Sequence, residues 1–161
     1  MSDQPNASTG ESHDAAALTR GAVRLLYDHG YDCLAEFPLQ SGRRADLIAL
    51  NRGGEVLIVE VKSSLADFRS DQKWPEYLEW CDGFFFAVAA VFPRDVLPAD
   101  HGLIVADGYG GAILRDAPRR KLSAPRRRTM TLRFGLVAAR RLQWLRDQVP
   151  EVSGGPNGED R

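Results

Sequence analysis

The stretch Arg44-Ala-Asp-Leu-Ile-Ala-Leu-Asn-Arg-Gly-Gly-Glu-Val-Leu-Ile-Val-Glu-Val-Lys62 decides the fold. Two apolar runs flank Asn51-Arg-Gly-Gly54, and because Asn and Gly accept positive φ cheaply, this pattern predicts two strands joined by a tight turn. Folding the second strand back places Asp46 opposite Val59 or Glu60, according to the register that the turn selects. The hairpin therefore brings charged side chains into a segment that is otherwise apolar.

Three charged groups gather at the far end of this hairpin. Glu60 and Lys62 lie on one strand face, and the reversal brings Asp46 near them. Two carboxylates suit Mg²⁺, which prefers hard oxygen ligands and takes one or two from protein carboxylates. A neighbouring lysine can orient a water and stabilise charge that develops on a phosphate. The alternative is structural, with a Glu60–Lys62 ion pair at a strand end and Asp46 capping a turn, and the spacing alone leaves both open.

Asp46 followed by Glu60-Val61-Lys62 resembles the signature of the PD-(D/E)XK nuclease superfamily. The next run, Ser63-Ser-Leu-Ala-Asp-Phe-Arg-Ser-Asp-Gln-Lys-Trp-Pro-Glu-Tyr77, resembles more narrowly the MmcB-like bacterial DNA repair proteins. This resemblance implies an α/β fold with a restriction-endonuclease-like core, in which helices flank a mixed central sheet. It also implies that Asp46, Glu60 and the Val61 carbonyl bind Mg²⁺ or Mn²⁺, that Lys62 is catalytic beside the two acids, and that the substrate is DNA in repair.

Further candidates follow the motif. A helix is predicted over 70–81, and related nucleases often use a Gln or Lys with a Tyr on this helix to hold DNA or a metal-bound water. The DNA-binding candidates here are Lys73 and Tyr77, which would share a face at i, i+4, and the auxiliary candidates are Asp67, Asp71 and Gln72. The alternative is a solvated helix start, where acids favour the positive end of the helix.

The chain contains a strongly basic segment although its net charge is only −1. Between Arg115 and Arg146 eleven Lys or Arg residues stand against one acid, Asp116. Such a bias suits the phosphates of a polyanion, although arginine-rich loops are also common as solvated surface. The candidate nucleic-acid-binding residues in this part are Arg119, Arg120, Lys121, Arg126, Arg127 and Arg128, all expected on an exposed loop.

Periodicity predicts the remaining elements. A first helix is expected over 14–29, capped by Ser12, and related nucleases often carry an acid in it, whereas only Asp14 and Asp28 flank it here. Strands are expected over 31–39, 83–92 (central in the sheet), 101–106 and 112–114. A last helix over 131–149 is predicted to bury Leu132, Leu136, Ala139, Leu142 and Leu145, and the side chains of Trp74 and Trp144 are expected in the core.

Composition indicates one globular domain. The 161 residues are 43% hydrophobic and 27% charged, so a domain over 13–149 is expected between disordered tails at 1–12 and 150–161. The apolar run 84–92 is too short to span a bilayer, and no signal peptide is visible, which predicts a cytoplasmic protein without membrane contact. Cys33 and Cys81 have no metal spacing and are expected to be free thiols.

Two functions follow from these observations. The first is a metal-dependent DNA nuclease acting in repair, which the trio Asp46, Glu60 and Lys62 favours. The second is a non-catalytic DNA-binding or adaptor protein that keeps the nuclease fold and works through a repair-protein partner, which the missing helical acid favours.

Overall fold

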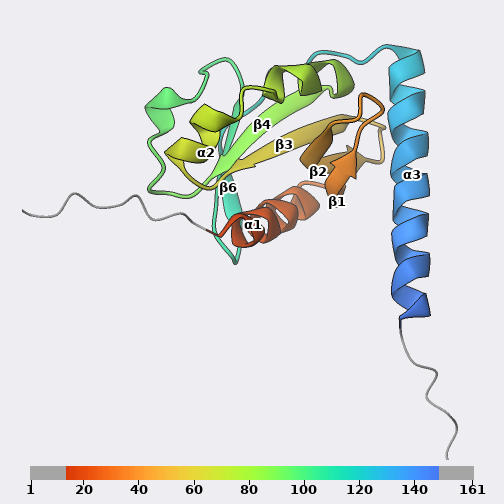
Figure 1. Ribbon diagram of the computed structural model, residues 1–161. Coiled ribbons are helices and arrows are strands. Elements are labelled where there is room, and N and C mark those ends of the chain that lie inside the picture. Colours follow the sequence, from red (N-terminus) through yellow and green to blue (C-terminus); the bar gives the residue numbers. More distant parts are fainter. Residues whose placement is uncertain (1–13, 149–161) are drawn as a thin grey trace, which may run out of the picture.

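The computed structural model describes residues 14–148, and within them a six-stranded sheet carries helices on both faces (Figure 1). The strands are β1 (Tyr31–Pro38), β2 (Arg44–Asn51), β3 (Val56–Lys62), β4 (Gly83–Val88), β5 (Gly102–Ala106) and β6 (Gly111–Arg115). The helices are α1 (Ala15–Asp28), α2 (Leu65–Ser70) and α3 (Ala124–Asp147), with the 3-10 helices η1 (Trp74–Trp80) and η2 (Arg94–Val96). The tails predicted at 1–12 and 150–161, and the cap Ser12, lie outside the described residues.

The sheet runs in sequence order, and it is mixed. Strands β1, β2 and β3 are antiparallel neighbours, β3, β4 and β5 are parallel, and β6 returns antiparallel to β5. The predicted central position of β4 is confirmed, although β4 ends at Val88 because the chain turns there, with the Phe92 amide donating to the Ala89 carbonyl. The mixed α/β architecture agrees with the predicted fold class at this level.

The hairpin of β2 and β3 forms as predicted. The Asn51 carboxamide oxygen accepts the Glu55 amide at 3.0 Å, and Gly54 has a φ of 80°, which a residue without Cβ adopts easily. Leu47 pairs with Val59, so the register continues to Asp46 opposite Glu60. This is the second of the two registers that the sequence allowed.

Two apolar layers hold the sheet. Helix α1 covers one face with Leu18, Ala22 and Leu26, while η1, α2 and the start of α3 cover the other. Asp14 caps α1, since its carboxylate accepts the Ala16 amide at 3.0 Å. Trp74 lies in the second layer as predicted, with its ring centroid 5.6 Å from that of Phe84.

The helix predicted over 70–81 is wrong. The chain instead forms α2, an extended break at Asp71 and then η1. The break occurs because the Asp71 carboxylate bonds the Lys62 ammonium on one oxygen and the Lys73 amide on the other, at 2.7 and 3.1 Å. Lys73 and Tyr77 are therefore not partners on one α-helix: Lys73 precedes η1 and is exposed, whereas Tyr77 is buried.

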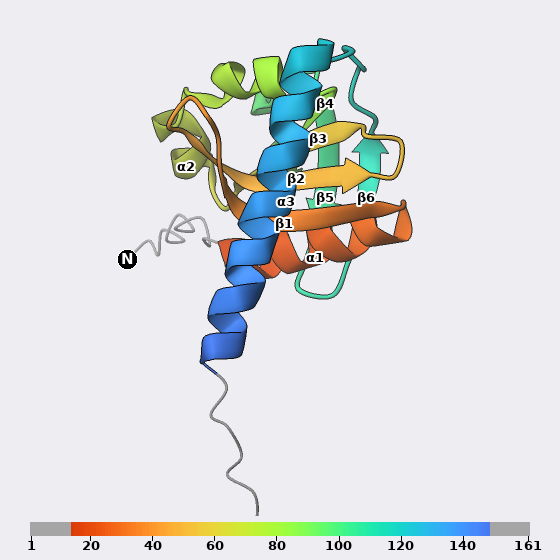
Figure 2. The ribbon, with the colours of Figure 1, turned by 90° about the vertical axis from the view of Figure 1, so that its right-hand side faces the viewer.

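The expected basic loop and last helix also need correction, because α3 already begins at Ala124 and contains Arg126 to Arg128. Figures 1 and 2 show α3 crossing β1 at the edge of the sheet, with its second half extending beyond the sheet. Its buried contact is Met130, with Phe134 and Val137 packed partly against the core. The side chains predicted as buried are exposed instead: Leu132, Leu136, Ala139, Leu142 and Leu145, together with Trp144.

Polar contacts explain why α3 turns its leucines outward. The guanidinium of Arg133 donates to the Pro38 carbonyl, and that of Arg141 donates to the carbonyls of Ala35 and Glu36 at 2.5 and 2.7 Å. These groups satisfy the free edge of β1, which a sheet must protect. Arginine thus shares the inward face of α3 with Met130, Phe134 and Val137, and the predicted leucine stripe is not part of that face.

Cys33 and Cys81 are both free thiols, as predicted. Within residues 14–148 no helix is long and apolar enough to cross a membrane.

Candidate functional site

The predicted acids and lysine lie together in a hollow of about 460 Å³ at the carboxyl end of β3. Ligands of sheets with parallel strands commonly bind outside such ends. Helix α1 and strands β1 to β3 form the walls together with the start of α2. The hollow is lined by Ala15, Ala16, Thr19, Arg20, Ala35, Glu36, Asp46, Glu60, Val61, Lys62, Asp67 and Asp71.

Asp46 and Glu60 are interlocked by the hairpin register. The Asp46 amide donates to Glu60 Oε1 at 3.3 Å, and the Val61 amide donates to Asp46 Oδ2 at 2.8 Å. Glu60 is only 2% exposed, and Asp46 is half-buried. Each carboxylate thus accepts a backbone amide of the partner strand through one oxygen, and its second oxygen takes no part in these two hydrogen bonds.

Burial makes both carboxylates harder to ionise. Burial, together with repulsion from Asp46, raises the pKa of Glu60 to about 8. Burial also raises the pKa of Asp46, although the Val61 amide and the Lys62 charge oppose the rise. A bound cation would relieve both effects, since it favours the ionised form of nearby acids.

Lys62 is a buried ammonium with two acidic partners. Its side chain is 2% exposed, and Nζ lies 2.7 Å from Asp71 Oδ2 and 3.6 Å from Glu60 Oε2. Burial alone would lower the pKa of Lys62, but its hydrogen bond to Asp71 and the charges of Glu60 and Asp71 outweigh burial and raise that pKa. Burial likewise works against ionising Asp71, but its bond to Lys62 lowers the pKa of Asp71. Lys62 therefore stays charged, and its hydrogen bond to Asp71 fixes the orientation of its ammonium group.

The other auxiliary candidates have local roles. Asp67 lines the hollow, but its carboxylate also accepts the amide and hydroxyl of Ser63 at 3.0 and 3.3 Å. The Gln72 carboxamide donates to the carbonyls of Phe68 and Arg69 at the end of α2. Gln72 and Lys73 do not line the hollow.

Tyr77 lies beneath the site, outside the hollow. Its hydroxyl donates to the Arg44 carbonyl at 3.0 Å, and its ring packs in the second apolar layer. Burial, with the charges of Glu60 and Asp46, raises the pKa of Tyr77. The contacts of Tyr77 support the strand that carries Asp46.

Glu36 is a site residue that sequence reasoning missed. It lies in β1 opposite Asp46, because Ala35 pairs with Leu47 and Phe37 with Ala45. Its φ of 50° is left-handed, a conformation that is costly for a residue with a Cβ and that clusters at functional sites. Its charge contributes to the raised pKa of Asp46. The pairing of β1 with β2 is the signal that could have revealed this residue, because its register places Glu36 opposite Asp46.

Arg20 was also missed, since its place in α1 carries no motif. It is exposed and lines the acidic hollow. Among residues 14–148 its side chain makes no hydrogen bond or ion pair. A positive group at the rim of a carboxylate cluster suits a phosphate brought to that cluster.

The basic segment from Arg119 to Arg128, predicted to bind DNA, lies near the start of β3, at the opposite end of this strand from the site. Arg127 donates to both oxygens of Asp82, which also accepts the Val56 amide at the start of β3. From Val56 to Lys62 a strand spans about 20 Å. The length of β3 therefore separates Arg127 from the Lys62 end of the strand.

Half of this basic set is used within the molecule. Arg119 pairs with Glu55, and Arg126 pairs with Glu79 at 3.2 Å, in addition to the Arg127–Asp82 pair at 2.7 Å. In the described part of the chain Arg120, Lys121 and Arg128 form no ion pair, so they are the members free to meet a phosphate.

The oxygen ligands at this site suit a hard divalent cation that needs only a few ligands from the protein. In residues 14–148 no three His, Cys, Asp or Glu side chains are grouped as a complete metal cage. Mg²⁺ does not require one, because it keeps several waters and takes one or two carboxylates. Asp46 and Glu60, with the Val61 carbonyl at the same strand end, meet this smaller requirement.

Comparison with known proteins agrees with the fold. No curated protein matches the chain. A solved structure of a protein of unknown function from Silicibacter pomeroyi is similar, with 48% sequence identity and a TM-score of 0.78, covering 85% of this chain and 92% of that one. The sequence model of the family described as DNA repair protein MmcB-like matches residues 2–149. The chain therefore belongs to the MmcB-like family of DNA repair proteins.

Proposed function

We propose that this protein is a metal-dependent DNA phosphodiester hydrolase of the PD-(D/E)XK type, acting in DNA repair. The family description supports a role in DNA repair. The observation that carries the enzymatic part is the trio of Asp46, Glu60 and Lys62 lining one hollow, with Glu60 and Lys62 buried and Asp46 half-buried. A restriction-endonuclease-like core is part of the same proposal, supported by the mixed sheet with the trio at the end of its β2–β3 hairpin.

In this proposal Asp46, Glu60 and the Val61 carbonyl hold Mg²⁺ or Mn²⁺. When bound, the ion would supply Lewis acidity and lower the pKa of a bound water. Lys62 donates to the attacking water or to the non-bridging oxygen of the phosphate, where negative charge develops. Asp71 keeps Lys62 charged and fixes the orientation of its ammonium, and the burial of Lys62 limits competition from water at that contact.

A non-catalytic DNA-binding or adaptor protein is the second candidate. The exposed apolar side chains of α3, including Leu142, Trp144 and Leu145, favour this reading because they form a surface that another protein could cover. The two candidates differ in one respect, since only the first predicts cutting.

Cleavage of a labelled DNA panel separates the candidates. Single-stranded, duplex, nicked, flapped, branched and crosslinked DNAs would be incubated with Mn²⁺ or EDTA. We expect wild type and Arg52→Ala, a control that removes an exposed cation in the β2–β3 turn outside the hollow, to cut with Mn²⁺ only, and Lys62→Ala to be inactive. Binding without cutting in all three proteins would reject the hydrolase and leave the adaptor.

A further inference from the structure

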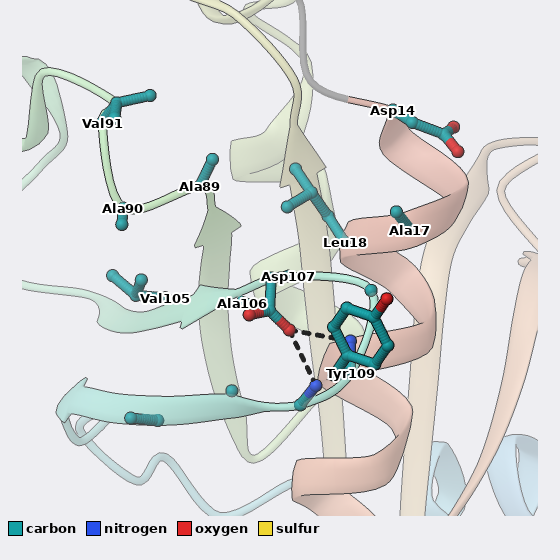
Figure 3. Close-up of a pocket in the computed structure, with 14 residues that line it drawn as sticks. Asp14, Ala17, Leu18, Ala89, Ala90, Val91, Val105, Ala106, Asp107 and Tyr109 are labelled. Carbon is teal, nitrogen blue, oxygen red and sulfur yellow. Dashed lines mark hydrogen bonds between the residues drawn. The ribbon is translucent and has the colours of Figure 1, made fainter.

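The first turns of α1 line a second hollow as well as the acidic one. Figure 3 shows the residues that line the second hollow. It measures about 830 Å³ and lies between the start of α1, the chain after β4, and the turn from β5 to β6. Most of its lining is small or apolar, as at Ala17, Leu18, Ala89, Val91 and Ala106.

The β5–β6 turn is locked from within. Asp107 Oδ1 accepts the amides of Tyr109 and Gly110 at 2.7 and 3.0 Å, shown as dashed lines in Figure 3. The Asp107 amide in turn donates to the Gly110 carbonyl at 2.9 Å. The turn is thus a closed ring of short hydrogen bonds.

Helix α1 fixes the same turn from outside. Arg24 donates to the carbonyls of Tyr109 and Gly108 at 3.0 and 3.4 Å. Gly21 allows the close approach, because a Cβ there would lie 2.0 Å from the Asp107 carbonyl oxygen. The turn cannot swing away to bury its own side chain.

This rigid turn presents a bare aromatic ring. Tyr109 is 86% exposed, although its backbone is held on both sides. Because the backbone of Tyr109 is already fixed, little further conformational entropy is lost when a flat ligand stacks on its ring. Nucleobases stack in this way on aromatic side chains of single-strand-binding proteins.

The two hollows lie at the same end of the parallel strands. Lys62 pairs with Val88, and Val88 pairs with Val105, which lines the second hollow, so two strand spacings, about 10 Å, separate the backbones of Lys62 and Val105. Arg20 joins the two hollows: it lines the acidic one, and its Nη2 lies 3.8 Å from the place of a Cβ on Gly108. A cation therefore lies between the carboxylates and the aromatic turn.

We infer that Tyr109 and Arg20 bind an unpaired nucleotide of DNA next to the acidic site, with the base stacked on the Tyr109 ring over the apolar hollow and the phosphate held by Arg20. This inference rests on the proposed function for the identity of the polymer. It adds a substrate class, DNA with a single-stranded segment at the site, because a base inside a duplex cannot offer its face to a side chain.

Binding measured in EDTA tests the inference without cutting. The probes are a fluorescent single-stranded oligonucleotide and the duplex of the same sequence. Tyr109→Ala is compared with Tyr27→Ala, which removes another exposed tyrosine, 69% exposed, from the far end of α1. We expect Tyr109→Ala to bind the single strand about tenfold more weakly, in line with the loss of one stacked base, and Tyr109→Phe and Tyr27→Ala to bind as wild type does.

Arg20→Ala supplies the second arm. It should weaken single-strand binding and reduce the dependence of log Kd on log salt by about one. Unchanged melting temperatures would confirm that both variants fold.

The outcomes separate the two proposals. Equal binding by Tyr109→Ala and Tyr27→Ala, or an equal loss on single strand and duplex, would overturn this inference and leave the hydrolase untouched. A Tyr109-dependent affinity in a protein that cuts no DNA would support the inference and reject the hydrolase. A Tyr109→Ala protein that binds DNA normally but changes its oligomeric state would show a protein contact instead.

Discussion

Replacing Glu60 with Gln should change how stability depends on pH. Burial and Asp46 raise the pKa of Glu60 to about 8 in the folded protein, against 4.5 for a free side chain. Between these values the folded protein binds more protons than the unfolded chain, so the free energy of unfolding falls as pH rises. This contribution is complete below the unfolded pKa and is lost as pH rises through the folded one.

The magnitude follows from proton linkage. One extra bound proton gives a slope of about 1 kcal/mol per pH unit through the middle of that window in metal-free buffer. Glu60→Gln removes the titrating group, so its slope should be shallower by about that amount, and its metal-free stability near pH 8 should exceed that of wild type.

Urea unfolding in EDTA from about pH 5 to pH 8.5 measures both slopes. Glu79→Gln, which changes an exposed carboxylate paired with Arg126, is the matched control and should follow wild type. Identical slopes in wild type and Glu60→Gln would refute the reasoning, since Glu60 would then titrate as a free side chain does.

Three other perturbations have defined outcomes. Arg127→Ala should destabilise the protein by about 3–5 kcal/mol in urea unfolding, because it leaves Asp82 buried without its ion pair; a loss below about 1 kcal/mol would contradict this. Arg141→Ala should lower the free energy of unfolding by about 1 kcal/mol, because the carbonyls of Ala35 and Glu36 lose their donors, whereas the neighbouring Arg140→Ala should not, and urea unfolding would compare them. Arg128→Glu should reduce the dependence of log Kd for DNA on log salt by at least about one, and an unchanged dependence would remove Arg128 from the interface.

The hairpin could be predicted from sequence because its determinants are local. Turn chemistry at Asn51 and Gly54 and the alternation of two short strands placed Asp46 near Glu60. The choice between two registers needed the structure, which pairs Leu47 with Val59. The trio is therefore the part of the site that local sequence could supply.

The outer part of the site depends on pairings that local patterns do not contain. Glu36 reaches Asp46 only through the register of β1 against β2, and Arg20 reaches the hollow only because α1 lies across the sheet. Asp71 was predicted at the start of a helix, where its bond to Lys62 in fact stops one.

Helix α3 shows a second limit of periodicity. An apolar stripe indicates a covered face only if something covers it, and the stripe through Leu132 and Leu136 remains open. On the inward side of α3, the guanidinium groups of Arg133 and Arg141 donate hydrogen bonds to backbone carbonyls of the edge strand β1. Counting basic residues has a similar limit, because the sequence does not show which of them form ion pairs within the fold, as Arg127 does with Asp82.

Titration of the metal itself tests the central claim most directly. Mn²⁺ would be added near pH 8 to wild type and to Asp46→Asn, with binding followed by calorimetry and by melting temperature. The account predicts one site in wild type, a rise of about 3–6 °C at ten times Kd, and loss of both signals in Asp46→Asn. Equal binding by the two proteins, or no binding by wild type at millimolar Mn²⁺, would contradict it.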